Sequence, residues 1–253
     1  MNDIVIRSDA KGSSGAGFFA VLRREVLGLT NTGIGWIVAA LMLSLSSIWF
    51  FWVGDFVERD IASLDAYFEI WPSLFAFLIP ALTMRSFADE RANGMQEVLS
   101  VLPVSTGAVV SAKFAALALF IVVVLACAIP VAFGAGLLGE LPASLVITQF
   151  AALVLLAWSM FAVGLLMSAL SSHQLIAYVA TTLVLLVLSF LDAAASIAGL
   201  GGAAVDIART VSLNARYEQP ARGLLSVADV TYFFVVIVLC VRATTHVINA
   251  RRY

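Results

Sequence analysis

The sequence has little charge for its length. Among its 253 residues only 12% are Asp, Glu, Lys or Arg, while 62% are hydrophobic and the mean hydropathy is +1.04. Soluble domains carry roughly a quarter charged residues and are about half apolar. The shortage of charge therefore excludes an ordinary soluble domain and predicts an integral membrane protein.

Histidine and cysteine are also scarce, which excludes several kinds of catalytic and metal site. The two histidines, His173 and His246, lie far apart and in no His-Glu-x-x-His sequence, and Gly-x-Ser-x-Gly is missing too. The two cysteines, Cys127 and Cys240, lie inside apolar runs, as small buried hydrophobic residues do. We therefore expect no catalytic residues, no metal and no cofactor in this chain.

A nucleotide-binding loop is missing as well. The glycine- and serine-rich stretch at 12–17 is not followed by the Gly-Lys-Ser/Thr that a phosphate-binding loop requires. We therefore expect that the chain cannot hydrolyse ATP by itself. If ATP drives this protein, a separate subunit must bind the ATP and its Mg²⁺.

What the sequence does contain is long apolar segments. A helix needs about twenty apolar residues to cross a hydrocarbon layer about 30 Å thick. Six segments meet this need and predict an all-α polytopic membrane protein: 34–53, 68–84, 114–138, 145–170, 175–198 and 227–248. Residues 18–29 are amphipathic and predict an N-terminal helix in the membrane interface. We expect residues 1–17 to be a flexible cytoplasmic tail and residues 18–253 to form a single transmembrane domain.

The distribution of Lys and Arg predicts the orientation of the spans. Six spans place both termini on one side, and ten of the fourteen Lys and Arg residues fall on that side. Cytoplasmic loops carry an excess of positive charge, so the N- and C-termini are expected in the cytoplasm.

One acid, Asp192, falls within a predicted span. A carboxylate at the centre of a bilayer costs about 2.5–3.5 kcal/mol on insertion scales. Two interpretations are open: the span ends near Phe190 and Asp192 reaches water outside, or Asp192 belongs to a transport pathway. We favour the first interpretation, because a run of small residues follows Asp192.

The densest group of charges lies between the second and third spans. This charged stretch, residues 83–105, reads TMRSFADERANGMQEVLSVLPVS. As a helix it would carry its apolar residues near one stripe and its charges opposite, with a break at Gly94 and an end at Pro103. The pattern predicts a short, bent amphipathic element on the membrane surface. It fits either a solvated loop or a docking surface for a partner.

Several separate blocks of the sequence resemble one family of membrane proteins. Residues 79–105, IPALTMRSFADERANGMQEVLSVLPVS, resemble the segment after the second span in ABC type-2 transporter permeases. The gliding-motility type is the most similar, and its members read roughly hPhhTMRSFxDExxxGTxExLLTxPhS. Met95 stands where Thr is common in that family. The runs ALSSHQLIAY at 169–178 and SLNARYEQPARGLLSVADVTYFF at 212–234 resemble the same family.

The resemblance implies a function and roles for particular residues. It implies the permease subunit of an ATP-driven ABC type-2 transporter, an exporter that works by alternating access with a separate ATPase subunit. In that family the charged stretch carries the cytoplasmic coupling helix. Its counterparts here are Arg85, Phe87, Asp89, Glu90, Arg91, Gly94 and Glu97. The second and fifth spans line the path in that family, which suggests Phe75, Phe77, Tyr178, Thr181 and Thr182 for it.

The resemblance also implies partners. These are an ABC ATPase subunit that holds ATP and Mg²⁺, a second permease chain, identical or related, and a subunit with a large extracytoplasmic domain. Membrane lipid is expected around the spans, and no nucleic acid is expected.

Other functions stay open at this point. One alternative within the same superfamily is a permease of a copper-site maturation-type ABC system. From other classes, a secondary transporter would usually show two related halves, and no convincing internal repeat is visible. An intramembrane enzyme would need the catalytic motifs that the sequence lacks.

Overall fold

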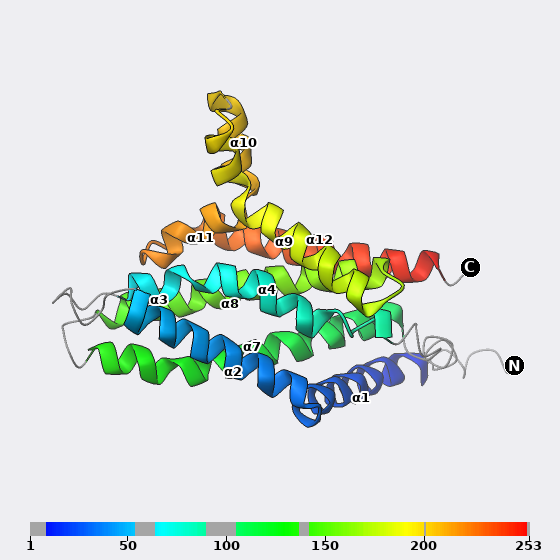
Figure 1. Ribbon diagram of the computed structural model, residues 1–253. Coiled ribbons are helices and arrows are strands. Elements are labelled where there is room, and N and C mark those ends of the chain that lie inside the picture. The colour runs from blue at the N-terminus through cyan, green and yellow to red at the C-terminus, as the bar shows by residue number, and fades with distance from the viewer. Residues whose placement is uncertain (1–8, 54–63, 90–104, 137–141, 200, 252–253) are drawn as a thin grey trace, which may run out of the picture.

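The computed structural model describes residues 9–53, 64–89, 105–136, 142–199 and 201–251, with the backbone alone for 9–16, 53, 135 and 136. Within these ranges the protein is all-α and has no β-strand (Figure 1). This confirms the predicted fold class.

Six long apolar helices form a bundle. They are α2 (Gly33–Ile48), which a π-helical turn η1 (Trp49–Val53) extends; α4 (Trp71–Thr83), which α3 (Asp65–Glu69) precedes; α7 (Thr106–Gly136); α8 (Ala143–Leu170); α9 (Gln174–Ile197); and α12 (Val227–Ala250). Each is long and apolar enough to cross a membrane, alone or with its short extension, and each overlaps a predicted span. The prediction of six spans is confirmed, although α7 begins at Thr106 rather than near Phe114.

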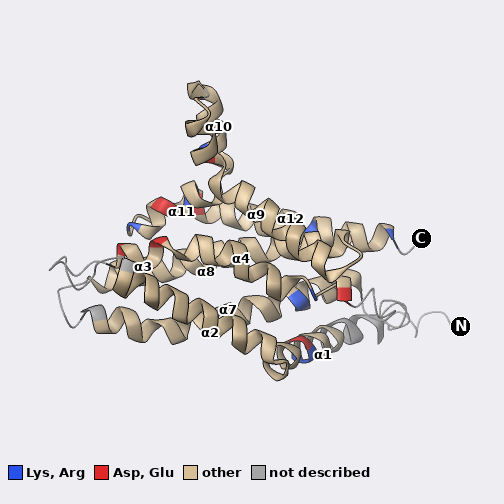
Figure 2. Ribbon diagram, viewed as in Figure 1, with Lys and Arg blue, Asp and Glu red and all other residues tan. Residues whose placement is uncertain are grey.

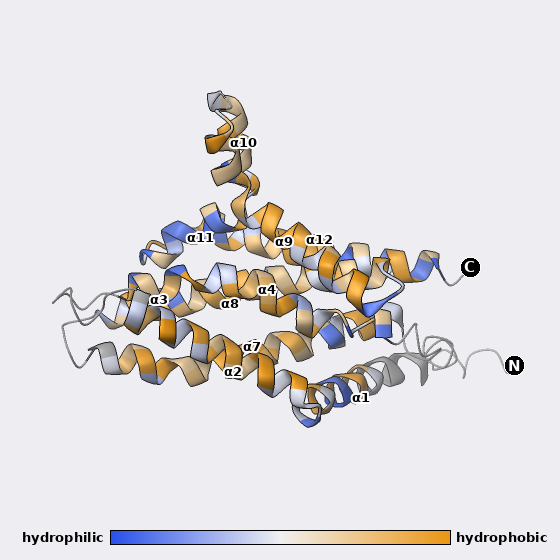
Figure 3. Cartoon of the chain, viewed as in Figure 1, coloured by the Kyte–Doolittle hydropathy of each residue, from blue (hydrophilic) through white to orange (hydrophobic). Residues whose placement is uncertain are grey.

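Successive spans run in opposite directions, which defines two ends of the bundle. The α1 end holds α1 (Asp9–Asn31), the start of α2 and the end of α12 (Figure 1). The α11 end lies opposite and holds α3 and α11 (Leu213–Ala221). Most charged residues lie toward these ends, and the helices between them are largely apolar (Figures 2 and 3).

The first helix is longer than the sequence indicated. α1 begins at Asp9, so residues 9–17 of the predicted tail are helical, while residues 1–8 lie outside the described residues. Val21, with Phe18 and Leu22 beside it, packs against the start of α7. The apolar side of α1 therefore covers part of the bundle, while its place in the membrane interface stays a prediction.

A sharp bend at Thr32 joins α1 to α2. Thr32 has an extended backbone (φ −84°, ψ 121°), and the indole Nε1 of Trp36 donates a hydrogen bond to the Thr30 carbonyl at 2.8 Å. A Cβ at Gly35 would overlap the Leu29 carbonyl oxygen, so only glycine fits where the two helices meet.

α8 is the central helix of the bundle and packs against α4, α7, α9, α11 and α12. It approaches α4 closely, because a Cβ at Gly164 would lie 2.5 Å from the Thr83 hydroxyl oxygen. In contrast, only 22% of the apolar window of α9 is buried, compared with 61% for α8. α9 therefore presents a wide apolar surface on the outside of the chain.

α9 changes direction at Phe190, whose backbone is not helical (φ −111°, ψ 17°). Beyond this kink the last turns of α9 pack on α10 (Gly202–Val211), and α10 stands out sideways from the bundle (Figure 1). The helix continues to Ile197, but it leaves the bundle direction where the span was expected to end. Asp192 follows directly after the kink.

Candidate coupling site at the α1 end

The charged stretch leaves the bundle at the α1 end. α4 ends at Thr83, residues 84–87 form a turn, and Ala88 and Asp89 begin another helical segment. We call residues 84–89 the root of the charged stretch. Three predicted coupling residues lie in the root: Arg85, Phe87 and Asp89. The other four lie outside the described residues: Glu90, Arg91, Gly94 and Glu97.

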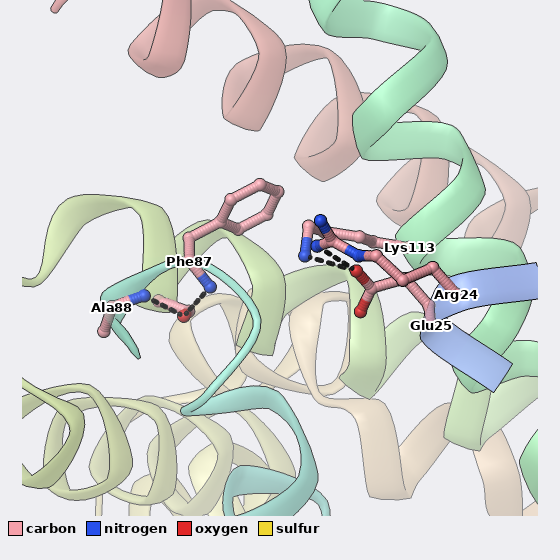
Figure 4. A network of polar contacts seen from close by, with 6 residues as sticks. Arg24, Glu25, Phe87, Ala88 and Lys113 are labelled. Atoms are coloured by element: carbon pink, nitrogen blue, oxygen red, sulfur yellow. Dashed lines mark hydrogen bonds and ion pairs between the residues drawn. The ribbon is translucent and has the colours of Figure 1, made fainter. Parts of the chain in front are cut away.

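A buried serine of α8 holds the root. The hydroxyl of Ser168 accepts hydrogen bonds from the backbone N–H groups of Phe87 at 3.2 Å and Ala88 at 3.3 Å (Figure 4). The same hydroxyl donates to the Met84 carbonyl at 3.3 Å. Backbone N–H and C=O groups in a turn lack the regular hydrogen bonds of a helix, so buried ones need other hydrogen-bond partners. One side chain supplies these partners and fixes the turn to the central helix.

The Phe87 side chain points into the bundle and is 8% exposed. The ammonium nitrogen of Lys113, from α7, lies 5.2 Å from the centre of the Phe87 ring, within the range of a cation–π interaction. Lys113 is itself buried, and its Nζ donates to Glu25 Oε1 of α1 at 2.9 Å (Figure 4). The root, α7 and α1 therefore meet in a single network.

Glu25 is the shared acceptor of this network. It also accepts a hydrogen bond from Arg24 at 2.8 Å. Burial raises the pKa of the Glu25 carboxyl, but the charges and hydrogen bonds of Lys113 and Arg24 outweigh burial and hold the pKa below its ordinary value. The carboxylate therefore stays ionised at neutral pH and compensates the buried Lys113 charge.

The end of the root contacts α9. Gln174, the first residue of α9, donates from Nε2 to Asp89 Oδ1. Nearby, Arg251 donates to the Leu170 carbonyl at 3.1 Å and ties the end of α12 to the end of α8. A cavity of about 180 Å³ lies between α1, the start of α2, α4 and α7, and its lining includes Glu25, Arg85, Asp89 and Lys113. A movement of the root would therefore act on several spans.

The residues predicted for a path divide between the interior and the surface of the chain. Phe75 and Thr181 are fully buried within it, whereas Phe77 is 49% exposed. Tyr178 is partly exposed and donates from its hydroxyl to the Phe77 carbonyl at 3.4 Å. Thr182 is partly buried. The second and fifth spans thus lie side by side, and the role of these residues stays a prediction.

Sequence reasoning did not assign Lys113, Glu25, Ser168 or Gln174 to this site. Lys113 does give a signal, because a lysine within an apolar helix needs an acidic partner. Ser168 gives none. Ser159 of the same helix is equally buried, and only the tertiary contact distinguishes the two serines.

Comparisons with protein-family models and with curated proteins find no match for this chain. The structure shows a helical protein with six candidate membrane spans. The chain is therefore assigned as a multi-pass membrane protein.

Proposed function

We propose that the chain is the permease subunit of an ATP-driven ABC type-2 exporter, similar to permeases of the gliding-motility type. The resemblance of residues 79–105 supports this function, and a six-span helical bundle is compatible with it. The observation that carries the proposal is the anchoring of the root by Ser168 and Gln174. This anchoring fixes the base of the charged stretch to the bundle, which a lever requires.

In the proposed mechanism, a separate ATPase subunit binds ATP and Mg²⁺ and pushes on the part of the charged stretch that follows Asp89. Because Ser168 and Gln174 tie the root to α8 and α9, the push shifts these helices instead of bending the turn. α8 contacts most of the other spans and distributes the movement. The bundle then alternates between inward and outward access.

The exporter would contain a second permease chain, identical or related, and a subunit with a large extracytoplasmic domain. The exposed apolar surface of α9 is suited to the second chain, since a path between two permeases would run beside α4 and α9. Phe77 and Tyr178 lie on that side of the chain. The assembly would lie in a bacterial inner membrane, with lipid against the remaining apolar surface.

Purification of the chain from its native membrane tests this proposal. We expect an ABC ATPase, identified by mass spectrometry, to co-purify, and ATP hydrolysis to appear only when it is present. Glu97→Arg should reduce both co-purification and hydrolysis, because disrupting a charge pair at an interface costs about 2–5 kcal/mol. Glu69→Arg, at an exposed acid of the α11 end, is the matched control and should change neither.

Two results would contradict the proposal. One is ATP hydrolysis by a verified preparation of the single chain. The other is a Glu97→Arg variant that keeps its ATPase partner and its full hydrolysis rate, which would make the charged stretch a solvated loop.

A further inference from the structure

A second group of charges surrounds a cavity of about 520 Å³ beside the kink of α9. α9, α10, α11 and α12 all contribute charged residues to it. They are Asp192, Asp206, Arg209, Arg216, Glu218 and Asp229. Four carboxylates against two guanidinium groups make the lining net negative, so we call it the acidic cavity. Such a concentration needs an explanation in a chain with only 12% charged residues.

Asp229 is the most buried acid of the acidic cavity, and its charge is only partly satisfied. It is 3% exposed, and its Oδ2 is buried with no hydrogen-bond partner among the described residues. Its Oδ1 lies 3.6 Å from Arg216 Nη1, whereas charge-assisted N–H···O bonds are about 2.7–2.9 Å long. A buried carboxylate is costly unless it is paired and hydrogen-bonded. Asp229 lines the acidic cavity, so a cation bound there would add to the incomplete pairing of its charge.

Other contacts hold Arg216 in place. Its guanidinium lies over the ring of Tyr232, 5.6 Å from the ring centre, and its Nε donates to the Thr210 carbonyl at 3.4 Å. Tyr232 is itself fixed, because its hydroxyl donates to the Val211 carbonyl. Arg216 is thus shared among several partners, which keeps it from closing on Asp229.

The other three acids of the acidic cavity are less buried than Asp229. Asp192 accepts a hydrogen bond from the Ser212 hydroxyl at 2.8 Å. Asp206 and Glu218 are exposed, and their side chains have no ion-pair or hydrogen-bond partner among the described residues. The acidic cavity therefore combines one deep acceptor, at Asp229, with further acceptors at its rim.

We propose that the acidic cavity binds an organic cation that carries two amine or guanidinium groups. One group pairs with Asp229, and the other with Asp206 or Glu218 at the rim. The volume lies within the range of about 300–1,000 Å³ that is usual for small-molecule sites. No group of three or more His, Cys, Asp and Glu among the described residues is arranged to hold a metal ion. That geometry favours a ligand with several N–H donors over a bare divalent ion.

Calorimetric titration of the full chain in detergent micelles tests the site, with putrescine as the probe. Its two controls have four-carbon chains and different charge: neutral 1,4-butanediol and the dianion succinate. We expect saturable binding of putrescine and no binding of either control. No saturable heat from putrescine, or equal binding of the diol, would overturn the proposal. The chain is titrated without an ATPase, so a negative result leaves the proposed permease function untouched.

Variants locate the binding. Asp229→Asn should weaken putrescine binding at least about thirtyfold, because it removes a buried charged partner. Asp206→Asn and Glu218→Gln should each weaken it up to about fivefold, as expected for exposed charges. Glu69→Gln, an exposed acid of the α11 end that does not line the acidic cavity, should leave binding unchanged.

The double variant Asp206→Asn/Glu218→Gln decides the question if Asp229→Asn does not fold, because both of its sites are exposed. It should bind putrescine more weakly than either single variant. Unchanged binding in the double variant would place the ligand elsewhere and overturn the assignment of the acidic cavity.

Discussion

Buried charges are paired differently at the two ends of the bundle. At the α1 end the buried Lys113 makes a 2.9 Å ion pair with Glu25, and Ser168 satisfies the backbone of the root. Near the α11 end the buried Asp229 lies 3.6 Å from Arg216, and one of its oxygens has no hydrogen-bond partner in the described part of the chain. Closed pairs preserve a shape, whereas an unsatisfied acceptor favours a ligand. This difference agrees with the two proposals, which assign force transmission to the first end and ligand binding to the second.

The first prediction concerns which end of the bundle faces the cytoplasm. Its expected effect is the largest, because a reporter fusion is either active or inactive. Reporter fusions after Arg91 and at the C-terminus should report the cytoplasm. Fusions after Asp60 and after Gln219 should report the outside. A cytoplasmic signal after Gln219 would show that the last two spans are wrongly oriented.

The second prediction concerns the packing at the α1 end, which the Phe87→Ala substitution disrupts. Phe87→Ala should lower the free energy of unfolding by about 3–5 kcal/mol, the usual cost of deleting a buried phenylalanine ring. Thermal unfolding of the purified chain measures the loss. Phe77→Ala is the matched control and should cost much less, since Phe77 is 49% exposed. Equal losses would mean that Phe87 does not hold the root against the bundle.

The third prediction breaks the ion pair at the α1 end. Lys113→Met should destabilise the chain by about 1.5–3 kcal/mol, because it removes a hydrogen bond between charged groups and leaves the Glu25 carboxylate without Lys113. Lys113→Arg keeps the charge and should restore part of the loss. The same thermal measurement distinguishes the two, and a Lys113→Met chain as stable as the original would contradict the role of this pair.

The fourth prediction concerns pH and has the smallest effect. The folded pKa of Glu25 is lower than its ordinary value, so ionised Glu25 stabilises the fold above that ordinary value. The stabilisation is lost as the pH falls through the lowered pKa. Glu25→Gln should therefore be less stable than the original chain at pH 7, and the difference should shrink at acidic pH. A difference that is constant with pH would mean that Glu25 acts through packing alone.

The length of the apolar runs was enough to predict the six spans, because a helix needs about twenty such residues to cross a membrane. The sequence also indicated a change near Phe190, since Asp192 would be costly inside the membrane, and α9 does kink there. The extent of α1 was not predictable in this way. Residues 12–17 are rich in glycine and serine, which favour loops on local propensity, yet they are helical.

The contacts of the candidate sites were harder to predict. The charged stretch marked where a partner could bind, but nothing local showed that Ser168 meets the root more than eighty positions back along the chain. The acidic cavity depends in the same way on the fold, because the kink of α9 and the turn into α11 bring Asp192 and Arg216 together. Tertiary packing decides these pairings, and a single sequence carries no record of it.

The central claim is that the root transmits force from an ATPase to α8, and removal of one hydroxyl tests it most directly. Ser168→Ala removes the partner of two buried N–H groups. Ser159→Ala removes a hydroxyl whose hydrogen bond among the described residues stays within α8, to the Leu156 carbonyl at 2.7 Å. Permease-stimulated ATP hydrolysis by the assembled complex should fall in Ser168→Ala and persist in Ser159→Ala, with the ATPase bound in both. Full stimulation in the Ser168→Ala complex would contradict the claim.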